Sequence, residues 1–219
     1  MADPTSEPSR AGRQRDPLID EAVMTVALEH LSRNGIGGFS IAAVASDAGT
    51  TRPAIYRRWN GKIDLLIAAV AWLASTEPPT RTGRPYADLV REMQHFRHCI
   101  SHVGALSLAG VMLTDGVEEP IRSTYHEQIA HPRWRRLGET LLLAVDLGEL
   151  PGDADIELGT SLLTGSWYAF AWSGRDPGED WPERVVAATW RALGGTPEAG
   201  LAAAVPGEAA YPQVTGRED

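Results

Sequence analysis

The sequence predicts an all-α protein with a small N-terminal helical domain followed by a larger helical domain. Apolar residues recur at helical spacing along most of the 219 residues, and no segment shows the alternation of a half-buried strand. Two short helical patterns separated by a glycine turn lie between residues 39 and 66. Helices joined in this way form a helix-turn-helix, whose second helix fits the major groove of B-DNA.

The first helix is expected to follow a polar arm. Residues 1–15 are rich in Ser, Pro, Gly and Arg without any period, which predicts disorder. This arm is either a solvated tail or a basic segment that reaches a neighbouring minor groove. A helix then starts at Asp16-Pro17 and ends near Asn34-Gly35, and its inward face is Ile19, Ala22, Val23, Val26 and Ala27.

The second and third helices carry clear end signals. Ser40 is a good N-cap for the second helix, which a glycine ends. Thr51 caps the third helix, and Pro53 suits its first turn because no N–H is needed there. Ile55 and Trp59, four residues apart, form its buried side. The basic and hydroxyl side chains of the third helix are therefore expected to face outward.

The run from Gly49 to Trp59, followed by Lys62 and Leu65-Leu66, resembles the TetR family of bacterial transcriptional regulators. The shared pattern is a turn glycine, a small hydroxyl cap, a tyrosine, an aromatic residue three positions later and a lysine opening the next helix. Trp59 replaces the usual phenylalanine, which bears on local packing only. The resemblance covers about the first third of the chain. It implies a homodimeric regulator, a repressor that a small molecule releases from a near-palindromic operator.

Residue chemistry within this stretch predicts the DNA contacts. Arginines can donate two hydrogen bonds to guanine or phosphate, hydroxyl groups can donate to phosphate, and small apolar side chains can contact a thymine methyl. Helix N-termini favour anions, which adds phosphate anchors. Arg58 is left open between DNA contact and a sideways position. The expected DNA-binding residues are Ser40, Thr50, Thr51, Arg52, Pro53, Ala54, Tyr56, Arg57 and Lys62.

The formal net charge of −9 is unevenly distributed. Residues 10–62 carry eight basic and five acidic side chains, whereas residues 63–219 carry twelve basic and twenty-two acidic ones. The basic footprint is local, so the acidic remainder should face away from the phosphates. With so few cations in each subunit, tight DNA binding is expected to need two subunits together.

Further helices are expected at residues 62–74, 86–103, 106–114, 118–130, 132–147, 155–172 and 183–193. The expected domains are the helix-turn-helix domain 16–74, a proline-containing linker 75–85, a ligand-binding and dimerisation domain 86–194, and a disordered tail 195–219. The last two helices carry more apolar surface than one small domain can cover, so we expect them to form the dimer; the alternative is an ordinary intrachain core. The apolar residues in question are Ile156, Gly159, Leu163, Ser166, Phe170, Val185, Val186, Thr189 and Leu193.

The larger domain is rich in aromatic residues and methionine, which line small-molecule pockets as well as cores. The resemblance implies that some of them line a cavity for a small apolar or aromatic effector. The expected ligand-binding residues are Met93, Phe96, Met112, Trp134 and Trp167.

A cluster of His95, His98, Cys99 and His102 has helical spacing and could bind a zinc-like ion or sense oxidants. We favour pocket or surface roles for these residues, and therefore expect no metal and no cofactor. Cys99 is the one cysteine, which excludes an internal disulfide.

Several other classes are disfavoured. The chain has no apolar run of eighteen residues and no signal-peptide core, so we expect a cytoplasmic protein without a membrane partner. No Ser-His-Asp order, P-loop or paired-carboxylate motif stands out, so no catalytic residue is expected. Two alternatives remain: a helical protein that sequesters a small molecule without regulated DNA binding, and a metal or redox sensor on the same scaffold.

Overall fold

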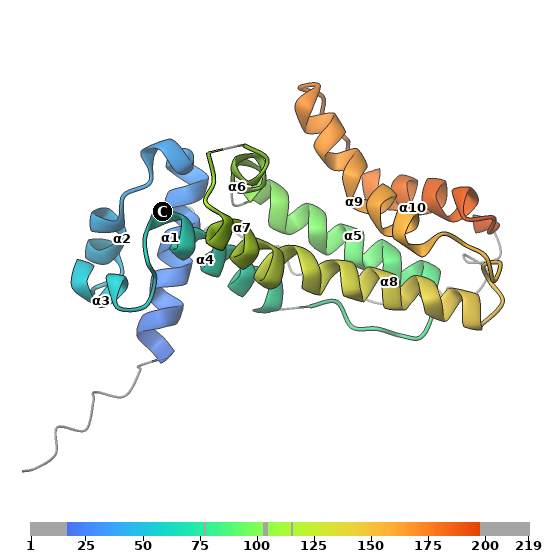
Figure 1. Cartoon of the computed structure of the whole chain (residues 1–219), viewed down its shortest axis with the longest axis horizontal. Helices are drawn as coiled ribbons and strands as arrows, with labels where there is room; N and C mark the ends of the chain where they lie inside the picture. The colour runs from blue at the N-terminus through green and yellow to red at the C-terminus, as the bar shows by residue number, and fades with distance from the viewer. Residues whose placement is uncertain (1–16, 77, 103–104, 115, 198–219) are drawn as a thin grey trace, which may run out of the picture.

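The computed structural model describes residues 17–76, 78–102, 105–114 and 116–197, and all regular secondary structure within these ranges is helical, which confirms the all-α prediction. Figure 1 shows α1 to α4 at one end of the molecule, while α5 and α8 run side by side through the rest and α9 rises away from them. The predicted arm and residues 198–219 of the predicted tail lie outside the described residues. The helices are α1 Pro17–Gly38, α2 Ile41–Asp47, α3 Arg52–Tyr56, α4 Lys62–Thr76, α5 Pro85–His102, α6 Ala105–Met112, α7 Glu119–Tyr125, the π-helix η1 His126–Ala130, α8 His131–Asp146, α9 Ile156–Trp172 and α10 Trp181–Ala192.

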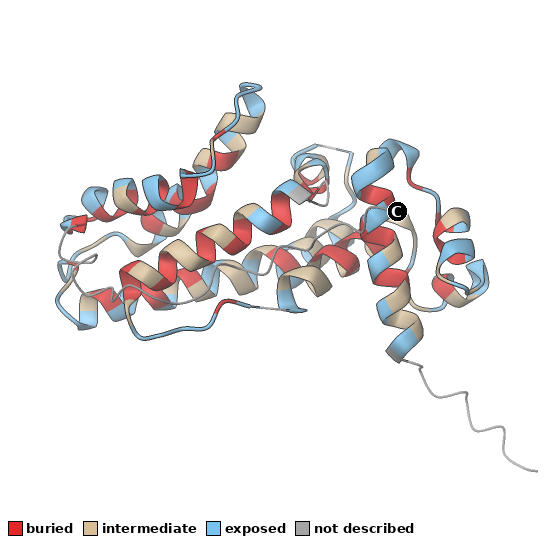
Figure 2. Cartoon of the chain, turned by 180° about the vertical axis from the view of Figure 1, so that it is seen from behind, coloured by how far each residue is buried: buried red, intermediate tan, exposed pale blue. Residues whose placement is uncertain are grey.

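The helices share two hydrophobic cores, and the first joins the N-terminal helices to part of the larger domain. Val44, Ile55 and Leu66 of α2, α3 and α4 are buried in it. Met112 of α6 and Ile129 of η1 belong to the same core, although both are far along the chain. The second core lies among α5, α8, α9 and α10. The buried faces in Figure 2 turn inward between these helices.

The apolar residues that we expected at a dimer interface mostly fill the intrachain core instead. Leu163 and Val186 are fully buried within the chain. At Gly159, an added Cβ would lie 2.8 Å from a methyl of Leu193, so this glycine allows α9 to approach the chain just beyond α10 closely. The close approach at Gly159 is therefore made within one chain.

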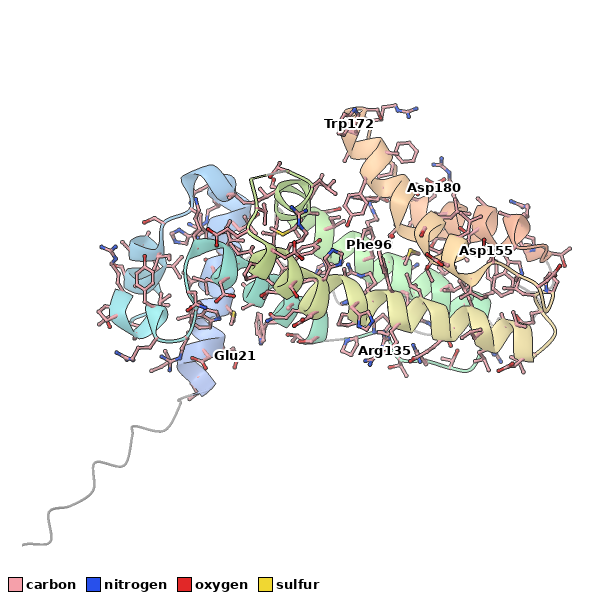
Figure 3. The ribbon with its side chains drawn as sticks, viewed as in Figure 1. Glu21, Phe96, Arg135, Asp155, Trp172 and Asp180 are labelled. Carbon is pink, nitrogen blue, oxygen red and sulfur yellow. The ribbon has the colours of Figure 1, made fainter. Side chains whose placement is uncertain are left out.

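A different face of α9 remains exposed. Leu158 and Leu162 are 51% and 38% exposed, and Trp172 is 93% exposed at the helix end, which Figure 3 shows projecting from the body. With Ala169 they follow helical spacing along one stripe of α9, which we call the α9 stripe. The contiguous apolar surface of a projecting helix is typical of an interaction face.

The predicted boundary of the tail is slightly wrong. Gly195 is buried, and its N–H donates to the Trp190 carbonyl at 2.9 Å. A Cβ at this position would lie 2.5 Å from the Trp190 ring, so the chain packs here because residue 195 is glycine.

No helix within the described ranges has the length and apolar character needed to cross a membrane.

An ion pair with a buried carboxylate fastens α5 to α8 and to the connection before α5. Arg136 donates through Nε to Glu92 at 2.8 Å and through Nη2 to the Pro79 carbonyl at 2.8 Å. Only 6% of the Glu92 side chain is exposed. Removing the carboxylate would leave the guanidinium largely buried without its counter-charge.

We therefore expect Glu92→Ala to lower the free energy of unfolding by about 3 kcal/mol, measured by urea denaturation. The matched control is Glu139→Ala. Glu139 also pairs with arginines, but half of its side chain is exposed, so its loss should cost less than about 1 kcal/mol. Equal losses in the two variants would contradict this assignment.

Candidate nucleic-acid interface and ligand cavity

Helices α2 and α3 are each held by a side-chain cap. The Ala43 N–H donates to Ser40 Oγ at 3.4 Å, and the Ala54 N–H donates to Thr51 Oγ1 at 3.3 Å. Both caps were expected from the sequence. Their positions set where α3 begins, and therefore which of its side chains face outward.

The turn between the two helices depends on Gly49, whose φ is 63°. The next residue, Thr50, donates its N–H back to the Ala45 carbonyl at 2.8 Å, which closes the end of α2. A side chain at residue 49 would be strained in this conformation. The glycine thus sets the angle at which α3 leaves α2.

The outward surface of α3 and the residue that follows it carries several of the side chains expected to contact DNA. Arg52, Pro53, Tyr56 and Arg57 are exposed, and Tyr56 is 48% exposed. Thr51 and Ser40 are exposed at the helix starts, while Thr50 and Ala54 are half-buried. Within the described part of the chain, neither Arg52 nor Arg57 has an ion-pair partner. Two exposed guanidinium groups without ion-pair partners therefore lie at the start and the end of α3.

Two other cations of this region are engaged inside the protein. Arg58 Nε lies 2.5 Å from Asp20 Oδ1, and this ion pair fixes the end of α3 to α1. Lys62 Nζ donates to the Ile36 carbonyl at 2.9 Å and so ties the start of α4 to the end of α1. Of the two positions left open for Arg58, DNA contact or a sideways position, the structure shows the sideways one. Contact of Lys62 with phosphate stays a prediction, since an ammonium group has further donors.

A cavity of about 350 Å³, which we call the larger cavity, lies between α5, α6, α7, η1, α8 and α9. Of the expected ligand residues, Phe96, Met112 and Trp134 line it. Met93 and Trp167 are instead buried in the second core and line neither cavity. The rings of Trp167 and Trp181 meet edge to face with their centres 4.9 Å apart, which accounts for the place of Trp167 in the core.

The larger cavity lies at the seam between the two cores. Met112 and Ile129 on its wall belong to the first core, which includes the helix-turn-helix. Phe96 and Tyr168 on the opposite wall belong to or pack on the second core. A ligand there would contact both groups of helices at once.

The smaller cavity, about 250 Å³, lies against the C-terminal end of α4. Ala74 of α4 and His95 of α5 line it, and His95 Nε2 contacts the Ala74 carbonyl at 3.1 Å. Ile129 and Arg133 line both cavities, so these two side chains separate them. The π-helix η1 supplies part of this shared wall, and π-turns are frequent at functional sites.

Sequence reasoning did not select several polar residues of the larger cavity, namely Arg122, Tyr125, His126, Arg133 and Tyr168. Tyr125 and Tyr168 interact electrostatically, and burial raises the pKa of both phenols, so both hydroxyls stay protonated. A helical pattern cannot reveal this pairing because α7 and α9 are distant in sequence. Arg122 and Arg133 were not selected because an arginine on a predicted helix usually marks a solvated face.

The histidine and cysteine cluster is divided between two faces of α5. His95 and Cys99 are buried and 3.6 Å apart, whereas His98 is exposed. The described residues contain no group of three potential metal ligands, and the His102 side chain lies outside them. Burial raises the pKa of the Cys99 thiol, which disfavours the reactive thiolate. The geometry therefore gives no support to the metal or redox alternative.

Comparison with known families matches almost all of the described chain. Residues 23–69 match the family model for bacterial regulatory proteins of the tetR family. Residues 79–189 match the model described as the tetracyclin repressor-like C-terminal domain. The first match spans the helix-turn-helix, and the second includes every residue that lines the larger cavity.

Individual relatives agree with these matches. The chain is 30% identical to the DNA-binding transcriptional repressor TetR of Mycobacteroides abscessus, over 63% of this chain and 73% of the relative. It is 22% identical to the HTH-type transcriptional regulator YdeS of Bacillus subtilis, over 72% and 80% of the two chains. The crystal structure of MexZ, a repressor of Pseudomonas aeruginosa, aligns with a TM-score of 0.56 at 22% identity, covering 81% of this chain and 96% of MexZ.

Proposed function

The chain belongs to the TetR family of bacterial transcriptional regulators, and from this premise we propose that it is a homodimeric repressor released from a near-palindromic operator by a small molecule. The observation that carries the proposal is the exposed surface of α3 behind a capped helix-turn-helix. Arg52 and Arg57 read guanine or bind phosphate, and Tyr56 with the neighbouring hydroxyl groups binds phosphate.

Dimerisation follows from the geometry of the target as well as from the protein surface. Two recognition helices must reach successive major grooves about 34–36 Å apart. The α9 stripe is an exposed apolar face that can join two copies, whereas the other face of α9 is covered by its own chain. A two-fold axis through α9 would bury Leu158 and Leu162 against their equivalents.

The larger cavity supplies a route from effector to DNA. Its α6 wall packs on α1 and α4, and α7 and η1 also pack on α4. A ligand that fits better when these helices separate favours a conformation in which the two copies of α3 no longer match the operator spacing. It can change DNA affinity only by its difference in affinity for the two conformations.

Selection from a random-sequence duplex library by the purified full chain tests this proposal. The recovered sequences should converge on two inverted half-sites about 10 base pairs apart from centre to centre, or a multiple of that spacing. Recovery of unrelated sequences, retained only at low salt, would contradict groove reading and favour the sequestering alternative.

A further inference from the structure

Arg133 differs from the other charged residues that line the two cavities. It lies on α8 just after the π-helix, and its guanidinium carbon is 4.8 Å from the centre of the Phe96 ring. Its side chain lines both the larger and the smaller cavity. Among the described residues, no carboxylate forms an ion pair with Arg133 and no carbonyl accepts a hydrogen bond from it.

The other cavity arginines differ from Arg133 because they are occupied. Arg136 binds Glu92 and the Pro79 carbonyl, as described above. Arg122 donates to the Met112 and Thr114 carbonyls and lies 3.7 Å from Glu119. The walls of both cavities together contain three arginines and one carboxylate, and that carboxylate is already paired.

A guanidinium cannot lose its proton under physiological conditions, so Arg133 must stay charged. Arg133 is half-buried, so its charge is only partly solvated, and the contact with the Phe96 ring compensates only part of the lost solvation. The positive charge of Arg133 also lowers the pKa of Tyr125 and Tyr168, although burial shifts both pKa values upward by more. The site therefore favours an anion that accepts hydrogen bonds from Arg133.

We propose that the effector is an amphipathic organic acid whose carboxylate binds Arg133 while its apolar or aromatic body fills the larger cavity. Phe96, Met112 and Trp134 give that body an apolar surface. The Tyr125 and Tyr168 hydroxyls border the same space and can contribute to binding a polar group near the carboxylate. This inference rests on the proposed function and names the chemical class of its effector.

Two matched pairs of probes test the inference by isothermal titration calorimetry without DNA. Naphthalene-2-carboxylate is compared with naphthalene-2-carboxamide, and decanoate with decanamide, so that each pair differs in charge at constant shape. The wild-type chain should bind at least one acid about tenfold or more tightly than its amide. Comparison of the aromatic pair with the aliphatic pair shows which kind of apolar group the cavity prefers. Equal affinity for acid and amide in both pairs would overturn the inference.

Arg133→Met should bring the acid-to-amide affinity ratio close to one while changing amide affinity less than about twofold. Arg133→Lys should keep a preference for the acid. The matched control is Arg135→Met: Arg135 lies on the solvent side of the same helix in Figure 3, so the wild-type ratio should persist. Equal weakening of acid and amide by Arg133→Met would mean that Arg133 only packs, and would contradict the inference.

Ala109→Leu locates the probes, because Ala109 is buried on the wall of the larger cavity and a leucine there would occupy its space. Both members of a pair should bind at least about tenfold more weakly to this variant. Unchanged binding would place the probes elsewhere and overturn the assignment. Should an acid bind through Arg133 and yet leave operator affinity unchanged, the regulatory proposal fails and the anion site stands.

Discussion

Arg52→Ala is expected to weaken operator binding by about 30-fold to 10⁴-fold, because a dimer loses the same contact in both half-sites and each bidentate contact contributes about 1–3 kcal/mol. Arg52 is exposed at the start of α3 and has no ion-pair partner within the described residues. The protein fold should be unaffected, since the side chain supports no other element. Fluorescence anisotropy with the selected operator, at fixed salt, measures the change.

The control for this prediction is Arg135→Ala, which removes the same formal charge from an exposed site on α8 away from the helix-turn-helix (Figure 3). Its operator affinity should stay within about twofold of wild type if the Arg52 effect is a contact and not a change in net charge. Similar losses in both variants would refute the assignment. Tyr56→Phe should produce a smaller loss, because it removes one phosphate contact and keeps the ring.

Leu162→Glu is expected to split the dimer and lower operator affinity by about 10²-fold to 10⁴-fold, since two linked half-site contacts become independent. Leu162 lies on the α9 stripe and is 38% exposed. Two copies of the new carboxylate would face each other across the two-fold axis without counter-charges. Light scattering coupled to size-exclusion chromatography should give the mass of one chain.

Leu113→Glu is the matched control, since Leu113 is 78% exposed at the end of α6 and lies off the α9 stripe. It should leave the dimer intact. A dimeric Leu162→Glu variant would show that another surface joins the two copies. A monomeric wild-type protein with full operator affinity would contradict the need for two subunits.

The helix-turn-helix could be predicted from the sequence because its signals are local. Ser40, Gly49 and Thr51 act on backbone groups within three to five residues, and the structure places these caps and this turn as expected. The buried pair Ile55 and Trp59 follows from helical spacing alone. The roles of Arg58 and Lys62 needed the structure, because their partners Asp20 and Ile36 lie on another helix.

In the larger domain, the sequence predicted which residues are apolar but not which elements they pack against. An apolar stripe predicts that residues such as Leu163 and Val186 are buried, but it does not say whether the partner belongs to the same chain. The aromatic content predicted a cavity, and its position between two cores depends on α6 packing back onto α1 and α4. Arg133 escaped notice because its significance lies in the absence of a nearby carboxylate, a property of three-dimensional packing.

Specific reading of the operator by α3 is tested most directly by the affinity of the wild-type chain for the selected operator and for a scrambled duplex of the same composition. Both titrations are made by anisotropy at the same near-physiological salt concentration. We expect a preference of about 10³-fold or more for the operator. Equal affinities that fall together as salt rises would contradict it, because they would show phosphate attraction without groove reading.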